Sequence, residues 1–289
     1  QGGGAGVCFL WKRKNDTQNK FADYLNKGDL VIACFGHSSD TEGEASDRTF
    51  ALPEVDKKML ASLSGCKKPI IGVVNAGGNI EMQGWVPTLK GLIWAFYGGQ
   101  EAGTAVGEAL FGKINPSGKL PMTFEKKWED NPAYNSYYDP DGDKHVAYTE
   151  GIFIGYRGYD KLKREVQYPF GYGLSYTTFK LSDLTVSKPN ADGTVEVTCR
   201  LANTGKRDGA QVVQAYVGKT ESSPVERPEK ELRKFEKVFL KAGESTTVKM
   251  TLPKESFMYF DVNSTQFVTD PGTYNIMLGF SSRDIKIQK

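Results

Sequence analysis

The chain has no long apolar stretch, few cysteines and very few histidines. None of its hydrophobic runs approaches the roughly 20 residues that a membrane-spanning helix needs, so the sequence predicts no membrane span. Its 4 cysteines and 2 histidines form no Cys-x-x-Cys pair or Cys/His cluster, which argues against a metal site or a disulfide framework. Cys34 and Cys199 fall in apolar strand patterns and are expected to be buried thiols.

An excess of charge of one sign is also absent. The net charge is +2 and the basic residues are scattered, so no nucleic-acid partner is expected. The glycine-rich start, Gly2-Gly-Gly-Ala-Gly6, lacks the Gly-Lys-Ser/Thr ending of a phosphate-binding loop. No Gly-x-Ser-x-Gly elbow supports Ser-His-Asp hydrolysis. Without an initiator Met or a signal-peptide pattern, the chain is expected to be a piece of a longer product.

The first part of the chain alternates strand and helix patterns. Apolar runs predict buried strands at 30–36, 69–76 and 91–98, and helical spacing predicts helices at 54–65, 80–90 and 101–111. Strands of near-continuous apolar character that alternate with helices indicate an α/β sandwich with a mostly parallel sheet, covered on both faces.

The character of the sequence changes twice after residue 125. Residues 126–178 are rich in turn signals and tyrosines, and we expect them to wrap across a surface as a connecting segment. Those tyrosines are candidates for plain packing or for a sugar-stacking rim. From residue 179, apolar and polar residues alternate between regularly spaced turns, which predicts an all-β sandwich. Its faces carry no obvious cluster of acids or histidines, so its expected role is structural.

The stretch that suggests chemistry runs from Thr41 to Pro53. It follows the predicted strand at 30–36, and open α/β sheets bind ligands at the carboxyl ends of their strands. Seven consecutive positions of this loop hold four ionisable residues, which are Glu42, Glu44, Asp47 and Arg48.

These residue types have different expected roles. Asp47 and Arg48 are neighbours and are expected to form a local ion pair that shapes the loop. A glutamate left over from that pairing is a candidate general acid/base, provided that its surroundings favour proton transfer near neutral pH. His37, just past the strand, could hydrogen-bond a substrate or one of the carboxylates, or fill a structural polar role.

Five short motifs follow one another along nearly the whole chain. They are Glu42-Gly-Glu-Ala-Ser-Asp-Arg48 with Leu52-Pro53, Gly98-Gly-Gln-Glu-Ala-Gly103, Gly112-Lys-Ile-Asn-Pro-Ser-Gly-Lys-Leu-Pro121, Tyr168-Pro-Phe-Gly-Tyr-Gly-Leu-Ser-Tyr176, and Pro228-Glu-Lys-Glu-Leu-Arg-Lys-Phe235 with Ala242-Gly-Glu-Ser245. In this order they resemble the C-terminal half of glycoside hydrolase family 3. That family places a catalytic (β/α)8 barrel first, then an α/β sandwich, and often a fibronectin type III-like domain.

The resemblance implies a retaining hydrolysis of terminal non-reducing β-D-glucosyl residues. It assigns the general acid/base to Glu44, three positions before the Asp-Arg pair, with Glu42 as the second choice. Asp47 and Arg48 would hold the shape of the loop. The attacking aspartate belongs to the barrel, and its Ser-Asp-Trp-like motif does not occur here, so this chain offers only one of the two carboxyl groups that retention requires.

The resemblance also implies partners and surroundings. It suggests no metal or organic cofactor, a barrel part of the same enzyme as partner, a β-linked oligosaccharide or glycoside as substrate, and a secreted or periplasmic location. We therefore expect an α/β sandwich at 1–125, a connecting segment at 126–178 and a fibronectin type III-like β-sandwich at 179–289. A β-xylosidase or another glycosidase of the family is one alternative. A non-catalytic carbohydrate-binding or scaffolding module is the alternative for the isolated chain.

Overall fold

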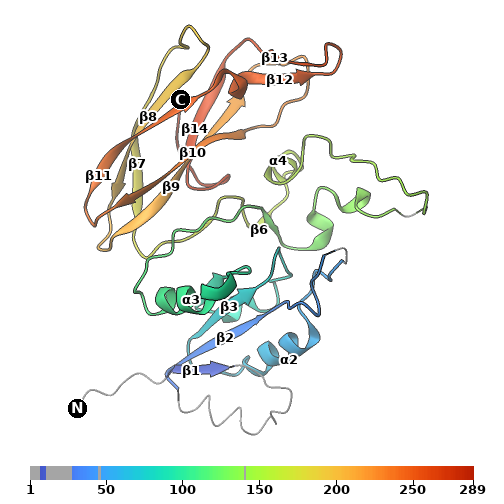
Figure 1. Cartoon of the computed structure of the whole chain (residues 1–289), viewed down its shortest axis with the longest axis vertical. Helices are drawn as coiled ribbons and strands as arrows, with labels where there is room; N and C mark the ends of the chain where they lie inside the picture. The colour runs from blue at the N-terminus through green and yellow to red at the C-terminus, as the bar shows by residue number, and fades with distance from the viewer. Residues whose placement is uncertain (1–6, 11–27, 45–46, 140) are drawn as a thin grey trace. The chain divides into compact units, whose positions relative to one another are not determined.

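The protein divides into two compact units (Figure 1). A computed structural model describes residues 7–10, 28–44, 47–139 and 141–289. Unit 1 comprises Gln1–Phe111 and Lys126–Trp128, and unit 2 comprises Gly112–Glu125 and Glu129–Lys289. The chain thus enters unit 2, returns briefly to unit 1, and enters unit 2 again. The three-part division expected from the sequence stays a prediction.

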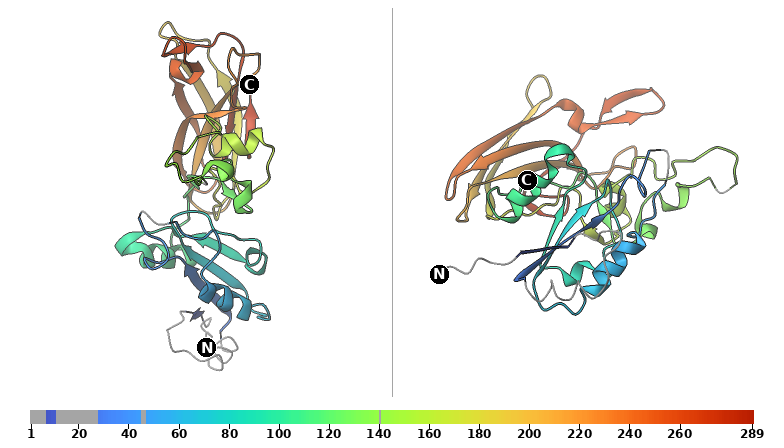
Figure 2. Two further views of the ribbon diagram at one scale, coloured as in Figure 1. Left: turned by 90° about the vertical axis from the view of Figure 1, so that its right-hand side faces the viewer. Right: turned by 60° about the horizontal axis from the view of Figure 1, so that its bottom comes forward.

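Unit 1 is built on a four-stranded sheet in the order β1-β2-β3-β4, in which every pairing is parallel. Its strands are β1 (Val7–Leu10), β2 (Leu30–Gly36), β3 (Ile70–Asn75) and β4 (Gly91–Trp94). Its described helices are α2 (Glu54–Ser62), α3 (Ala102–Leu110) and the 3₁₀ turns η1 (Val86–Thr88) and η2 (Gly99–Glu101). Figure 2 shows α2 and α3 on opposite sides of the sheet, which confirms the α/β sandwich. No helix in the described ranges is both long and apolar enough to cross a bilayer.

The buried strands of unit 1 explain its apolar runs. Val31 and Phe35 point to one face of β2 and Ile32 to the other, and all three are buried. The ring of Phe35 packs edge-on against Trp85, with 5.0 Å between the ring centroids. Cys34 contradicts the expectation of a buried thiol, because the described residues leave it exposed on the face of β2 opposite Phe35.

The predicted helix at 80–90 is wrong. Within this stretch the structure forms only η1, and Pro87 stands in its first turn. Gly84 and Pro87 both disfavour a continued helix, glycine through its conformational entropy and proline through its missing N–H. Ile80 and Met82 are nevertheless buried, so their apolar character serves a loop that packs into the core.

Unit 2 is a β-sandwich. One sheet has the order β10-β9-β14-β15 and the other β11-β8-β7, and every pairing in them is antiparallel. The strands are β7 (Phe179–Val186), β8 (Val195–Asn203), β9 (Gly209–Lys219), β10 (Glu231–Leu240), β11 (Ser245–Leu252), β14 (Tyr274–Gly279) and β15 (Ile285–Gln288). Along β8 the apolar side chains of Val195, Val197, Cys199 and Leu201 are buried in the core between the sheets, as their alternation predicts.

Smaller elements complete unit 2. They are two antiparallel pairs, β5 (Phe124–Glu125) with β6 (Val166–Tyr168) and β12 (Met258–Asp261) with β13 (Gln266–Thr269), the helix α4 (Tyr156–Lys161), and the 3₁₀ turns η3 (Trp128–Asp130), η4 (Tyr134–Ser136) and η5 (Lys254–Phe257). Of these, η3 begins on Trp128, a residue of unit 1.

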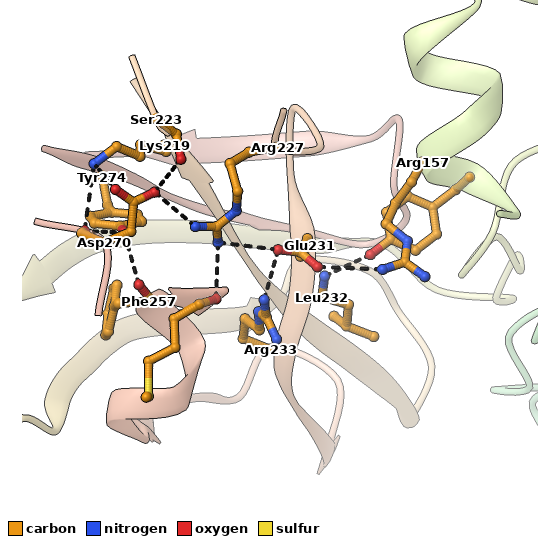
Figure 3. Close-up of polar contacts among 12 residues, drawn as sticks. Arg157, Lys219, Ser223, Arg227, Glu231, Leu232, Arg233, Phe257, Asp270 and Tyr274 are labelled. Carbon is orange, nitrogen blue, oxygen red and sulfur yellow. Dashed lines mark hydrogen bonds and ion pairs between the residues drawn. The ribbon is translucent and has the colours of Figure 1, made fainter. Parts of the chain in front are cut away.

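A cluster of buried charges joins β9 to the loop before β14 (Figure 3). Asp270 lies 3.0 Å from Lys219 Nζ, and the two side chains are only 3% and 1% exposed. The Asp270 carboxylate also accepts hydrogen bonds from Ser223 Oγ at 2.6 Å and from Arg227 Nη1 at 3.0 Å. Burial raises the pKa of Asp270, but the hydrogen bonds from Ser223 and Lys219 and the charges of Lys219 and Arg227 outweigh that effect and hold it below its usual value.

The cluster extends along β10. Arg227 lies 3.6 Å from the carboxylate of Glu231, which also pairs with Arg233 at 2.7 Å and with Arg157 of α4 at 3.4 Å. These alternating charges connect the long loop after β9 with strand β10 and helix α4 (Figure 3).

Candidate active site on the acidic loop

The loop that carries the predicted acid/base leaves the sheet at Gly36. This residue has φ +136°, and a Cβ built there would lie 1.9 Å from the carbonyl oxygen of Asn75, so no other residue fits. Its N–H donates to Asp56 Oδ2 of α2 at 3.1 Å, and the next N–H, that of His37, donates to Asn75 O at 2.7 Å. The end of β2 is therefore held by both β3 and α2 where the loop begins.

A tight turn opens the loop. The backbone N–H groups of Thr41 and Glu42 both donate to Ser38 O. The Thr41 hydroxyl accepts the N–H of Ser38 at 3.0 Å and lies 3.1 Å from His37 Nδ1. These hydrogen bonds among residues of the loop hold the backbone at Glu42 in place.

His37 is buried beneath this turn. Its side chain forms no hydrogen bond with any described carboxylate, and its buried Nε2 has no partner among the described residues. Burial lowers the pKa of His37, the charge of Arg48 lowers it further, and the charge of Glu42 opposes both effects in part. This arrangement supports a neutral imidazole for His37.

Glu42 is held by three partners from three different loops. Its carboxylate accepts hydrogen bonds from Tyr97 Oη at 2.6 Å and from Gly77 N at 3.2 Å, and it lies 3.2 Å from Arg48 Nε. Gly77 follows β3 and Tyr97 follows β4, so the contacts join the carboxyl ends of three adjacent parallel strands. We refer to Glu42, Arg48, Gly77 and Tyr97 as the clamp.

The clamp keeps Glu42 ionised. Burial raises the pKa of Glu42, but the hydrogen bonds from Tyr97 and Gly77 and the charge of Arg48 overcome this and lower it. Burial and the bond to Glu42 together raise the pKa of Tyr97 to about 12, so the phenol stays a donor. A carboxylate held in this state is a poor proton donor at neutral pH.

Arg48 anchors the far end of the same loop. Besides its ion pair with Glu42, it donates from Nη2 to Asn79 O at 2.6 Å and from Nη1 to Thr49 O at 3.2 Å. Asp47, the partner predicted from its adjacency, is exposed on the loop. The ion pair between Glu42 and Arg48 closes the base of the loop.

Glu44 stands between the two anchored residues. Its side chain is exposed, and it has no hydrogen bond or ion pair with any residue that the structure describes. The two glutamates, only two positions apart, are therefore in opposite situations. Glu42 is fully engaged in holding the loop, and Glu44 is available to act on a molecule outside it.

Two members of the clamp were not predicted from the sequence. Tyr97 contacts Glu42 across 55 positions of sequence, and Gly77 does so across 35. The available signals were weak. Gly77 belongs to a glycine doublet just after a predicted strand, and Tyr97 ends an apolar run that resembles a strand throughout.

One group of carboxylates elsewhere could hold a cation by distance alone. The carboxylate oxygens of Asp139, Asp141 and Asp143 lie within 4.8 Å of one another in unit 2. The N–H groups of Lys144 and Gly142 already bond to Asp139, and the first of these bonds is the main reason for its lowered pKa. This is the pattern of a self-bonded turn, and nothing else in the described chain points to an ion there.

Comparison with known proteins agrees with this organisation. Residues 11–156 match the family described as "Glycosyl hydrolase family 3 C-terminal domain", and residues 211–282 match the "Fibronectin type III-like domain". The second match falls within the β-sandwich of unit 2, which confirms its predicted fold.

Curated relatives match nearly the whole chain. Thermostable beta-glucosidase B of Acetivibrio thermocellus is 39% identical over 274 residues, an alignment that covers 94% of this chain and 36% of the relative. An exo-alpha-(1->6)-L-arabinopyranosidase of Bifidobacterium longum is 36% identical, with 93% and 35% covered. The chain thus spans about a third of the length of these relatives.

Solved structures show the same likeness. The GH3 beta-glucosidase of Bifidobacterium adolescentis superposes with a TM-score of 0.89 at 34% identity, covering 97% of this chain and 42% of that one. Beta-glucosidase 3B of Thermotoga neapolitana, in complex with glucose, gives a TM-score of 0.86 at 34% identity, with 94% and 39% covered. Taken with the family match over residues 11–156, these likenesses show that the chain belongs to glycoside hydrolase family 3.

Proposed function

We propose that this chain supplies the general acid/base of a retaining, exo-acting β-glucosidase, and that Glu44 is the residue. The observation that carries the proposal is the contrast between the two glutamates of the loop. Glu44 is an exposed carboxyl group at the carboxyl edge of a parallel sheet, with no hydrogen bond or ion pair to any residue in the described ranges, whereas Glu42 is occupied by the clamp. A barrel part of the same enzyme would supply the attacking aspartate, about 5 to 5.5 Å from the acid/base.

In the first step the barrel aspartate attacks the anomeric carbon while Glu44 gives its proton to the glycosidic oxygen. The bond between that carbon and that oxygen breaks, the leaving group departs as an alcohol, and the sugar stays as an ester on the aspartate. In the second step the Glu44 carboxylate takes a proton from water, whose oxygen attacks the anomeric carbon and frees the aspartate. The two inversions together retain the β configuration.

Glucose is the sugar that the relatives favour. Both the Acetivibrio relative and the Bifidobacterium adolescentis structure carry the name beta-glucosidase. The Bifidobacterium longum relative, an exo-alpha-(1->6)-L-arabinopyranosidase, supports the second candidate, which is another glycosidase of the family, with a β-xylosidase included. A panel of nitrophenyl glycosides with glucose, xylose and arabinopyranose tests the assignment, and the sugar with the highest kcat/KM identifies the activity.

The role of Glu44 is tested in the enzyme assembled with its barrel. Glu44→Gln should lower kcat/KM about 100- to 10,000-fold for alkyl glycosides, because general acid catalysis contributes that much. Activated aryl glycosides, whose leaving groups need little protonation, should lose far less. Azide should restore turnover to Glu44→Ala and yield the β-glycosyl azide. Rescue of Glu42→Ala alone would overturn the assignment.

A function from another class applies to the chain in isolation. Without the barrel it would act as a non-catalytic carbohydrate-binding or scaffolding module, since it offers a single catalytic carboxyl group. Turnover assays with and without the barrel part separate the two. Activity of this chain alone would contradict our proposal. A secreted or periplasmic location of the enzyme remains part of the proposal, and fractionation of the native host would test it.

A further inference from the structure

The acid/base loop is held by side-chain contacts of Glu42 and Arg48, and not of Glu44, the proposed acid/base. Glu42 and Arg48 bracket Glu44 in the sequence, and both are bonded to the loop that follows β3. Glu42 accepts from Gly77 N at 3.2 Å, and Arg48 donates to Asn79 O at 2.6 Å. The ion pair between them, at 3.2 Å, then closes the segment that contains Glu44.

The loop after β4 is shaped to reach this segment. Phe96 has a φ of +51°, a left-handed conformation that is unfavourable for a residue other than glycine. The next residue is Tyr97, whose hydroxyl donates to Glu42 Oε2 at 2.6 Å. Strained backbone at such a place is commonly retained where it holds a functional side chain in position.

Close approach at the base of the clamp depends on a missing side chain. A Cβ built on Gly77 would lie 2.6 Å from Glu42 Oε1 and 3.2 Å from Tyr97 Cε2. The backbone of Gly77 has no positive φ, so its lack of a Cβ matters for space and not for conformation. Alanine there should therefore push the carboxylate away without straining the chain.

We propose that Glu42 is a positioning residue, held by Tyr97, Gly77 and Arg48, and that it sets the place from which Glu44 protonates the leaving group. The inference rests on the proposed function of Glu44. Glu42 itself touches neither the substrate nor the reacting atoms. Its lowered pKa is consistent with this, because a permanently ionised carboxylate can hold Arg48 and the two donors throughout a catalytic cycle in which Glu44 gains and loses a proton.

The test uses three variants that break the clamp from different sides, Tyr97→Phe, Glu42→Gln and Gly77→Ala, in the enzyme assembled with its barrel. Each should lower kcat/KM for alkyl glycosides about 10- to 100-fold, because a displacement of about 1 Å at a reacting group costs that much. For an activated aryl glycoside, kcat/KM should stay within about threefold, because protonation contributes little there. KM for both substrates should change little, because the proposed role of Glu42 is to position Glu44 and not to bind the sugar.

Two matched controls share the loop after β3. Glu81→Gln removes a charge at an exposed position, and Gly84→Ala adds a methyl group where no heavy atom of the described residues lies within 4 Å. Both should match the parent enzyme on both substrates. Urea unfolding followed by tryptophan fluorescence shows whether each variant is folded.

The outcomes separate the two proposals. Equal losses on alkyl and aryl glycosides in the folded variants, or no loss at all, would overturn the positioning role. If Glu44→Gln shows the leaving-group dependence and the clamp variants do not, only this inference fails. If Glu44→Gln shows none, the proposed acid/base assignment fails first.

Discussion

The two units each contain a carboxylate surrounded by cationic and hydroxyl donors, and water reaches the two sites very differently. In unit 1, Glu42 and Arg48 keep 21% and 17% of their side-chain surface exposed. In unit 2, Asp270 and Lys219 keep 3% and 1%. Both carboxylates have lowered pKa values, in each case because hydrogen bonds and cations outweigh burial.

This difference decides what each arrangement can contribute. A buried charge that loses its partner stays uncompensated in a medium of low polarity, so removing one partner of a buried pair is strongly destabilising. Water still reaches the pair of Glu42 and Arg48 and can replace part of what a lost partner provided, so its contribution to stability is smaller. Breaking the cluster around Asp270 should therefore cost the fold much more than breaking the clamp around Glu42, whose main effect is on geometry at the edge of a sheet.

The largest effect expected from this comparison is on Asp270→Asn. The substitution leaves Lys219 buried without its counter-charge, and we expect it to lower the free energy of unfolding of unit 2 by about 3 to 5 kcal/mol. Cys199 is the one cysteine in the sequence range of unit 2, and it is buried. Urea titration of the full chain, with labelling of Cys199 followed by peptide mass spectrometry, measures this loss.

Tryptophan fluorescence provides the internal reference for that experiment. The sequence range of unit 2 contains no tryptophan, so the fluorescence transition reports unit 1 and should not move. Asp183→Asn makes the same chemical change at an exposed position of unit 2, and surface changes of this kind usually stay within about 0.5 kcal/mol. A loss of less than about 1 kcal/mol for Asp270→Asn would remove the contrast between the two units.

The second effect is a dependence on pH. Because the folded-state pKa of Asp270 lies below its unfolded value of about 3.9, its stabilising contribution is complete above that value and is lost as the pH falls through the folded-state pKa. The stability difference between the parent and Asp270→Asn should therefore be largest above about pH 5 and shrink as the pH falls below about 4. Urea unfolding at stepped pH, followed by far-ultraviolet circular dichroism, checks this. A difference independent of pH would mean that the aspartate acts without its charge.

The smallest effect on stability is expected at the clamp. Glu42→Gln should lower the free energy of unfolding of unit 1 by less than about 1 kcal/mol, because its ion pair with Arg48 is partly exposed. Tryptophan fluorescence during urea titration measures it. A cost equal to that of Asp270→Asn would show that the clamp contributes to stability. The activity losses expected for the clamp variants would then have to be reinterpreted as effects on folding.

Much of the fold could be predicted from the sequence. The run Leu30–Gly36 matches β2 end to end, because its apolar character is continuous and most of its residues on both faces are buried, Cys34 being the exposed one. The alternation around Val197 likewise matched β8, where one face is buried and the other is not. The helix predicted over 80–90 failed because apolar residues that fill a core from a loop imitate helical spacing by chance.

The candidate site was predictable only in its local part. Glu44 and Glu42 could be singled out because they share one short loop at a strand end. What distinguishes them is the contact of Glu42 with Tyr97, which depends on the order of the strands and on the backbone of Phe96, and neither can be read from residue spacing. The ion pair of Arg48 with Glu42 likewise depends on how the loop folds, because adjacency in sequence pointed only to Asp47.

The assignment of Lys126–Trp128 to unit 1 has a practical consequence for dissecting the protein. No single cut yields both halves intact, because truncation after Phe111 removes a piece that belongs with the parallel sheet, and truncation after Trp128 carries Gly112–Glu125 away from the sandwich. Strand β5 would then be severed from β6, its pairing partner. Anyone who wants the sandwich alone should graft residues 112–125 onto residues 129–289 with a short linker, since conventional deletion from one end would discard part of its own structure.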